Sequence, residues 1–143
     1  MTTRYWIVVA SRDHAMVGQS SGFVQACHRK KGPVSRIKAD DWVVLYSPKI
    51  QFEGAMPCQA FTVIGRLVND QVYPFDMGNG FVPHRRDVEF ETCHEVSLRP
   101  LIDNLGFITN KRYWGAAFRS GLLEIQQGDF QLIANRMLAP SVD

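Results

Sequence analysis

Short apolar runs, in which aromatic and β-branched side chains dominate, predict strands in the first third of the chain. Residues Tyr5–Ala10 form one such run, which is typical of a buried strand. Asp41–Tyr46 forms the next. We expect this second strand to end at Ser47-Pro48, because proline cannot donate a hydrogen bond to a sheet ladder.

Two later segments show the alternation of apolar and polar residues that marks half-buried strands. Gln59–Val68 predicts a third strand, and Gly65 within it indicates a bulge or a sharp bend. Residues 81–91 predict a fourth strand, because they alternate clearly from Asp87 onward. Pro83 confines the start of this strand to a sheet edge or a bulge.

Helical periodicity is clearest near the end of the chain. In residues 130–138 apolar side chains recur at spacings of three and four, and Asp129 precedes them as a candidate cap. Phe23–His28 predicts a short helix, whereas the serine- and glycine-bearing residues 11–22 predict a loop. Two further short helical segments are expected: Leu101–Leu105 and Trp114–Arg119.

Strands separated by short helices predict an α+β fold, namely a small β-barrel on a mixed five- to six-stranded sheet flanked by short helices. The length of 143 residues suits one domain, residues 1–143, with a core of its own. Hydrophobic residues make up 45% and charged residues 21%, which is typical of a globular protein. The formal charge of +2 is too small to indicate a polyanion partner, so the placement of the charges has to decide.

The cysteines and the apolar segments favour a cytoplasmic location. The three cysteines, Cys27, Cys58 and Cys93, are odd in number and lack paired spacing, so a disulfide framework is not expected. The apolar run after Arg4 is shorter than the core of a signal peptide. The sequence also lacks the roughly 18 consecutive apolar residues of a membrane span.

Motifs of the common enzyme classes are missing from the sequence. It has no G-x-S-x-G nucleophile elbow and no phosphate loop, and Gly78-Asn79-Gly80 lacks the third glycine of a dinucleotide site. We therefore expect a protein without enzyme activity. The alternative is a small nucleotide-directed hydrolase, with His28 as the base and Ser11 or Ser47 as the nucleophile.

Two Cys-His pairs are the only candidates for metal ligands. Cys27-His28 and Cys93-His94 could be combined into a four-ligand set. Zinc ligands are usually separated by two or more residues, however, so that their side chains converge on one ion. Neither a metal nor a cofactor is expected.

Basic residues beside aromatic ones indicate a nucleic-acid partner, because cations neutralise phosphates and rings stack on bases. Three basic clusters are candidates: Arg29-Lys30-Lys31, Arg85-Arg86, and Lys111-Arg112 before Tyr113-Trp114. Gln25 adds an amide to an otherwise apolar segment, where its donor and acceptor could read a base edge. The alternatives are a solvated face for each cluster and a core position for Trp6.

Five motifs, in this order along the chain, resemble the EVE domain: Tyr5–Ser11, Gly22–His28, Asp41–Lys49, Phe61–Gly65 and the Arg85-Arg86 strand. The resemblance covers nearly the whole chain, from Arg4 to about Met137. It implies a PUA-like fold, related to the YTH and ASCH domains. It also implies a pocket between the first helix, the end of the second strand and the neighbouring loops, where relatives hold a nucleobase, often a modified one, flipped out of a nucleic acid.

Site residues follow from the resemblance and from the charge clusters. The base pocket would be formed by Trp6, Ser11, Gln25, His28, Tyr46, Ser47 and Pro48. Phosphate or backbone contacts would come from Arg29, Lys30, Lys31, Arg85 and Arg86. The family often has asparagine where this chain has Cys27 or His28, so a different base preference is expected if that position reads the base.

The expected function is recognition of a nucleobase without chemistry, in RNA or DNA that is single-stranded or presents a flipped base. We expect the protein to act as a monomer. The alternative is a regulatory module that senses a free nucleobase or nucleoside. Salt separates the two, because polyanion binding weakens steeply with salt and free-base binding does not.

Overall fold

The computed structural model describes residues 2–25 and 32–139. In chain order the elements are β1 (Tyr5–Val9), α1 (Arg12–Ser21), β2 (Phe23–Gln25), α2 (Gly32–Ser35), β3 (Trp42–Lys49), β4 (Pro57–Leu67), β5 (Tyr73–Pro74), β6 (His84–Phe90), β7 (Val96–Ser97), the 3-10 helices η1 (Arg99–Asn104) and η2 (Trp114–Phe118), β8 (Leu122–Ile125) and α3 (Gln127–Met137).

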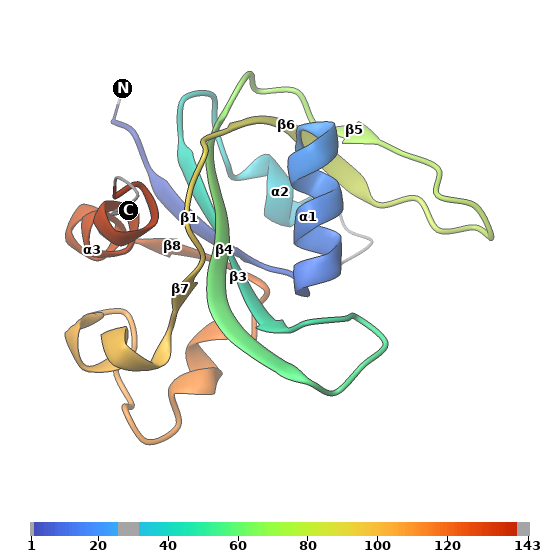
Figure 1. Cartoon of the computed structure of the whole chain (residues 1–143). Coiled ribbons are helices and arrows are strands. Elements are labelled where there is room, and N and C mark those ends of the chain that lie inside the picture. Colours follow the sequence, from blue (N-terminus) through green and yellow to red (C-terminus); the bar gives the residue numbers. More distant parts are fainter. Residues whose placement is uncertain (1, 26–31, 140–143) are drawn as a thin grey trace.

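The strands form one curled mixed sheet, a half-barrel that carries a few short helices (Figure 1). Six strands follow the order β2-β6-β4-β3-β1-β8, and the two-residue strands β5 and β7 pair with β6 and β4. β1 and β3 run parallel, whereas β1–β8, β3–β4, β4–β6 and β2–β6 are antiparallel. The predicted fold class, a small α+β barrel on a mixed sheet, is therefore confirmed.

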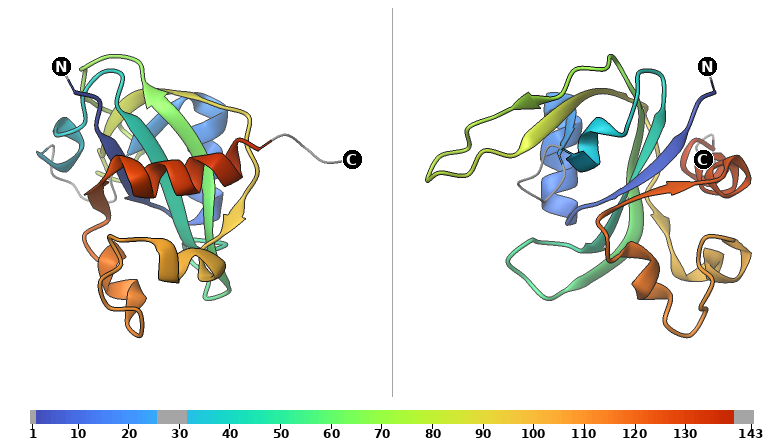
Figure 2. Two further views of the ribbon diagram at one scale, coloured as in Figure 1. Left: turned by 90° about the vertical axis from the view of Figure 1, so that its left-hand side faces the viewer. Right: turned by 180° about the vertical axis from the view of Figure 1, so that it is seen from behind.

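Each face of the sheet has its own apolar cluster, because side chains alternate along every strand. In β1, Ile7 belongs to the cluster on the α3 side, whereas Trp6 and Val8 belong to the cluster on the α1 side. In β3, Val44 and Val43 divide in the same way. Figure 2 shows α3 lying across one face of the sheet, and Figure 1 shows α1 on the other.

Helix α3 has the predicted apolar face except at Leu138, which follows the helix and is 41% exposed, and its first turn also differs from the prediction. Four of its residues are buried: Phe130, Ile133, Ala134 and Met137. The residue that caps the helix is Gln126, so the prediction of Asp129 as the cap is wrong. The Asp129 carboxylate instead accepts hydrogen bonds from the backbone N–H groups of Gly106 and Phe107, at 2.9 and 2.8 Å. It therefore ties α3 to the loop after η1.

The segment around Gly22 corrects two predictions at once. Residues 12–21, expected as a loop, form helix α1, which ends at Gly22 in the left-handed region with φ of 77°. Residues 23–25, expected as the start of a helix, form strand β2 and pair antiparallel with β6. A three-residue strand is too short to show alternation, so only its pairing partner decides its conformation.

Strand β3 continues through the proline that was expected to end it. Pairing with β4 shifts register between Ser47 and Lys49, and Pro48 occupies this irregularity, where a missing N–H breaks no regular ladder bond. Gly65 in β4 is required by the close approach of β6. A Cβ atom there would lie 2.6 Å from the carbonyl oxygen of Glu89, so β6 can approach β4 only because position 65 has no side chain.

Within residues 2–25 and 32–139, every helix falls short of the length and apolar character that crossing a membrane requires.

Candidate functional site

A cavity of about 300 Å³ opens on the α1 side of the sheet. It lies among α1, β2, the β3–β4 loop and the β5–β6 loop, which extend to the same side of the molecule in Figure 1. The residues that line it are Ala10, His14, Val17, Gly18, Phe23, Val24, Gln25, Leu45, Phe52, Met77, Phe81 and Arg85. Most of the lining is apolar, so the few polar groups decide what orients a ligand there.

Gln25 and Arg85 form the fixed polar pair of this cavity. They face each other across the β2–β6 ladder, and Arg85 Nε donates a hydrogen bond of 2.8 Å to Gln25 Oε1. This bond uses the amide oxygen and so determines which way the amide points. The Gln25 amino group then points to the sulfur of Met77, 3.8 Å away, which is a weak acceptor that a ligand oxygen or nitrogen can replace.

The guanidinium of Arg85 is held between two aromatic rings. Its carbon lies 3.7 Å from the ring centroids of both Phe23 and Phe75, and the whole residue is 7% exposed. Burial lowers the pKa of Arg85 from its ordinary value. Because this arginine is clamped on both faces, the Gln25 amide that it holds is fixed as well.

His14 and Phe52 also line the cavity, and their rings stack against each other with centroids 4.9 Å apart. Asp13 sets this arrangement, because its carboxylate accepts hydrogen bonds from the backbone N–H groups of both residues. The Ser11 hydroxyl donates to the same carboxylate. That bond is the main reason why the pKa of Asp13 is lowered, and the contact with the Phe52 N–H adds to it. The start of α1 and the β3–β4 loop are thereby joined at the cavity.

The model of the EVE domain family matches residues 4–136, which is nearly the whole chain. The chain belongs to the EVE domain family. A "UPF0310 protein in gntR 5'region" of Bacillus licheniformis is 45% identical over 90% of this chain and 87% of its own length. A UPF0310 protein of Streptococcus sanguinis is 47% identical over 94% of each chain.

Solved structures agree on the fold. The crystal structure of protein Atu2648 from Agrobacterium tumefaciens has a TM-score of 0.57 and covers 99% of this chain and 100% of that one. The NMR structure of Rpa0253 from Rhodopseudomonas palustris also has a TM-score of 0.57 and covers 97% of both chains. Each is 13% identical to this chain, so the likeness shows the fold alone. The expected PUA-like EVE fold is confirmed.

In this EVE domain, Trp6 does not line the cavity that contains Gln25. The indole is fully buried, and its Nε1 donates a hydrogen bond of 2.9 Å to Asp41 Oδ2. Asp41 also accepts hydrogen bonds from the backbone N–H groups of Arg4 and Lys38. Trp6 is therefore a core residue that organises the entry into β3, and its buried ring presents no face to a base.

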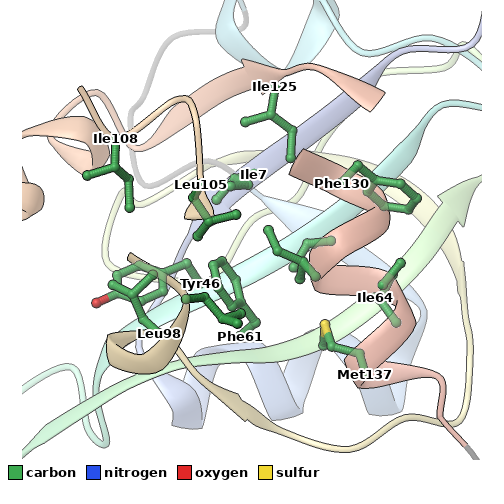
Figure 3. Close-up of a cluster of buried hydrophobic side chains, with 14 of the residues drawn as sticks. Ile7, Tyr46, Phe61, Ile64, Leu98, Leu105, Ile108, Ile125, Phe130 and Met137 are labelled. Carbon is green, nitrogen blue, oxygen red and sulfur yellow. The ribbon is translucent and has the colours of Figure 1, made fainter. Parts of the chain in front are cut away.

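Tyr46 also lies away from the cavity, in the cluster on the α3 side of the sheet. Figure 3 shows its ring beside Phe61 and Leu98. Its other neighbour is Phe118, whose ring stacks on it with centroids 4.1 Å apart. Burial raises the pKa of Tyr46 to about 12. The expectation that Tyr46 stacks a base is therefore corrected, because its side chain lies on the α3 side of the sheet, away from the cavity.

Ser11, Ser47 and Pro48, the remaining described pocket candidates, lie outside the cavity lining. Ser11 acts through Asp13, as described above. Ser47 is fully buried, and its hydroxyl lies 2.9 Å from that of Thr62. Pro48 occupies the irregularity of β3. Of the seven predicted pocket residues, only Gln25 is therefore brought to the cavity wall by the described structure.

The two adjacent arginines of β6, both expected to contact a phosphate or a base edge, have different surroundings: Arg85 lines the cavity, whereas Arg86 is enclosed in the core. Arg85 holds Gln25, whereas Arg86 on the other face is fully buried. The Arg86 guanidinium donates to the backbone carbonyls of Val34, Ile37 and Asn69. Burial lowers the pKa of Arg86, and its hydrogen bonds join α2 to the sheet. The predicted contacts at His28, Arg29, Lys30 and Lys31 lie outside the described residues.

The apolar period of helices and strands did not identify two of the aromatic residues that line the cavity. Phe52 is an aromatic residue in the polar segment Gln51–Gly54, and Phe81 follows the glycine-bearing loop 76–80. Neither residue lies in a regular element, because Phe52 is in the β3–β4 loop and Phe81, expected at the start of the fourth strand, precedes β6. His14 was not identified either, because the segment that carries it was not recognised as a helix.

Among residues 2–25 and 32–139, no three His, Cys, Asp or Glu side chains lie close enough together to hold a metal ion. Cys93 is a free thiol whose sulfur contacts the carbonyl oxygen of Thr62 at 3.6 Å. Burial raises the pKa of this thiol. The other predicted pair, Cys27-His28, lies outside the described part of the chain.

Proposed function

We propose that this EVE domain is a non-catalytic module that holds a nucleobase of a nucleic acid in the cavity beside α1. The observation that carries the proposal is the Gln25 amide, fixed by a clamped Arg85 at the wall of an apolar cavity of about 300 Å³. Membership of the EVE family supports a binding module of the PUA-like type. The nucleobase and the nucleic acid are our inference from the site.

The size and the chemistry of the cavity suit one planar ring system. Ligand pockets usually span about 300–1,000 Å³, so this one is at the small end. Apolar walls, with the stacked His14 and Phe52 rings on one side, favour a flat aromatic ligand. The Gln25 amino group then donates to an oxygen or ring nitrogen on the base edge.

A base that comes from a strand, rather than from solution, has to leave its stack. This costs a few kcal/mol, and least in a single strand. Stacking on a protein ring returns about 1–3 kcal/mol per base. The basic segment Arg29–Lys31 follows Gln25 by a few residues in the sequence and supplies cations of the kind that neutralise phosphates. Binding of a strand is therefore energetically reasonable.

The hydrolase alternative loses support from the surroundings of its two nucleophile candidates. Ser47 is fully buried beside Thr62, and Ser11 is 5% exposed with its hydroxyl bound to Asp13. Neither hydroxyl lines the cavity. A nucleophile has to reach the substrate, and neither hydroxyl opens into this cavity.

Replacing Gln25 by glutamate tests the proposal. A carboxylate keeps the bond to Arg85 but has no donor for the base edge. We expect the Gln25→Glu variant to lose about 1–3 kcal/mol of discrimination between bases in calorimetric titrations with nucleosides and short single-stranded oligonucleotides. Gln131→Glu, on the exposed side of α3, is the matched control and should bind like the parent. If both variants bind the whole panel like the parent, the pocket lies elsewhere.

Salt dependence separates strand binding from sensing of a free nucleobase. If a strand is bound, log K should fall as log salt rises, and replacing Lys30 and Lys31 by alanine should flatten the slope by about 1.4, at roughly 0.7 per phosphate contact. A salt-independent affinity for free nucleosides would instead favour the sensor.

A further inference from the structure

A second cavity, of about 180 Å³, lies in the loop of residues 107–119, which we term the aromatic loop. Figures 1 and 2 show this loop, drawn in orange, on the side of the sheet away from α1. The residues that line the cavity are Phe107, Ile108, Thr109, Asn110, Tyr113, Trp114, Ala116 and Ala117. It shares none of them with the cavity that contains Gln25.

The aromatic loop is held in place by contacts with the core and with η1. Phe118 is buried, stacks on Tyr46 and meets Phe107 edge-on at 5.8 Å. Lys111 Nζ donates to the carbonyls of Ile102 and Leu105, both at 2.9 Å, and so fixes the loop to the end of η1. The walls of the second cavity are therefore preorganised, which reduces the entropy cost of binding.

Tyr113 is presented to solvent by a fixed turn. Its side chain is among the most exposed large apolar groups in the described chain, at 62%. Asn110 Oδ1 accepts hydrogen bonds from the backbone N–H groups of Arg112 and Tyr113, at 3.1 and 3.0 Å. These bonds use the amide oxygen, so the amino group of Asn110 remains to donate at the cavity wall. An exposed ring and an amide donor thus lie at the same small hollow.

Positive charge surrounds this hollow. The guanidinium of Arg112 lies 5.4 Å from the ring centroid of Tyr113, and that of Arg99 lies 5.3 Å from the ring centroid of Trp114. Arg119 follows η2 and is exposed. Four cations of this region, Arg99, Lys111, Arg112 and Arg119, outnumber its two acidic residues, Asp103 and Asp129. Asp129 lies close by, because its carboxylate accepts hydrogen bonds from the backbone N–H groups of Gly106 and Phe107. The local field therefore favours an anionic ligand that carries a ring.

We propose that the aromatic loop binds a nucleotide, with the base against Tyr113 and the phosphate facing Arg112. A hollow of about 180 Å³ admits a ring system but leaves a sugar and phosphate outside, where the arginines are. Aromatic rings beside cations are the usual means of binding single-stranded nucleic acid without sequence preference. The site is independent of the proposed function of the first cavity.

A residue-resolved NMR titration of the whole protein with adenosine monophosphate tests this site. The backbone signals of residues 107–119 should shift, and Tyr113→Ala should weaken the affinity for this loop by about 5- to 150-fold, the range for loss of one base stack. Tyr113→Phe keeps the ring and should bind like the parent. Because Tyr113 is exposed, the folded state should survive both changes, and urea unfolding of each variant checks this.

The controls separate this site from the first cavity and from simple anion binding. Gln25→Glu should leave the shifts of the aromatic loop unchanged, so failure of one site is distinguishable from failure of the other. Inorganic phosphate and an acidic peptide should bind far more weakly than the nucleotide. A single-stranded oligonucleotide that binds more tightly than the mononucleotide would identify a strand as the source. Equal affinity of parent and Tyr113→Ala, or equal affinity for the acidic peptide, would overturn the proposal.

Discussion

The two faces of the sheet are covered by helices of similar length but very different buried side chains. Helix α3 buries large residues, among them Phe130, Ile133 and Met137, and they close its face against η1 and η2. Helix α1 buries only Ala15 and Gly18. Small residues bring α1 close to the sheet beneath it, but they leave space beside it that no large side chain fills. The space between α3 and the sheet is therefore filled by large side chains, and we term this the closed face, whereas the α1 face has the Gln25 cavity at the edge of its core.

The comparison of the two faces predicts its largest effect for truncation of Tyr46, which lies on the closed face. Tyr46→Ala should cost about 3–5 kcal/mol in the free energy of unfolding, because it removes a fully packed aromatic ring. Base binding at the α1 cavity should be nearly unchanged. Urea unfolding and calorimetry measure the two quantities separately. If Tyr46→Ala instead abolished binding and left the free energy of unfolding unchanged, Tyr46 would be a residue of the binding site and not of the core.

High pH should weaken the protein through the same residue. The pKa of Tyr46 is raised to about 12 from an ordinary value of 10, mainly by burial. Between pH 10 and 12 the unfolded chain releases this proton while the folded protein retains it, so stability falls across that window, on the order of 2 kcal/mol. Denaturant unfolding at a series of pH values measures the loss, and Tyr46→Phe should reduce it. A variant with the same alkaline slope as the parent would contradict the assignment.

Adding one methyl group at Gly18 tests why α1 lies so close to the sheet. A Cβ atom there would lie 2.6 Å from the backbone carbonyl oxygen of Phe23, so β2 has to move. We expect Gly18→Ala to cost about 1–3 kcal/mol and to weaken ligand binding, because Gln25 follows on the same strand.

Gly128→Ala in the first turn of α3 is the matched control. The added Cβ atom would meet nothing within 4 Å, so this change should be neutral or should stabilise by up to about 1 kcal/mol. Equal effects of the two glycine substitutions in denaturant titrations would refute the close-packing argument.

The smallest expected effect concerns the ion pair that fixes the start of α1 to the segment before β7. Arg12 Nε and Nη2 donate to the Glu95 carboxylate at 2.8 and 2.7 Å. Both side chains are more than a third exposed, so Arg12→Ala should cost only about 0.2–1 kcal/mol, and less in high salt. The bond to Arg12 lowers the pKa of Glu95, so this contribution should fade as pH falls below the ordinary range for glutamate. A salt-independent effect would show that packing of the Arg12 stem matters more than its charge.

Regular, well-buried elements were predictable from local pattern. The strands near Tyr5 and Trp42 and the helix near Ile133 were expected close to where the structure has them. The two strands are short continuous apolar runs, which are typical of strands buried on both faces, and the helix repeats its apolar residues at spacings of three and four. The α1–β2 region was predicted wrongly, because a glycine- and serine-bearing helix with small buried residues has almost no periodic signal.

Some residues of the candidate site were likewise predictable from the sequence, and others were not. Gln25 was recognisable, because an amide in an apolar segment is locally unusual, and the family was recognisable from the order of its motifs. Tyr46 and Arg86 were misassigned, because the sequence gives residue types but not which side of a strand they occupy. A shift of one residue in strand register exchanges the core and the pocket faces.

The sequence by itself determined the fold class, the family and the residue types available for binding. Only the tertiary structure decided that Arg85 holds Gln25 while its neighbour Arg86 is buried, because adjacent residues of β6 point to opposite faces of the sheet. Only the tertiary structure, likewise, brought His14, Phe52 and Met77 together. They come from three segments distant in sequence, and local patterns carry no information about contacts that form only when a chain closes on itself.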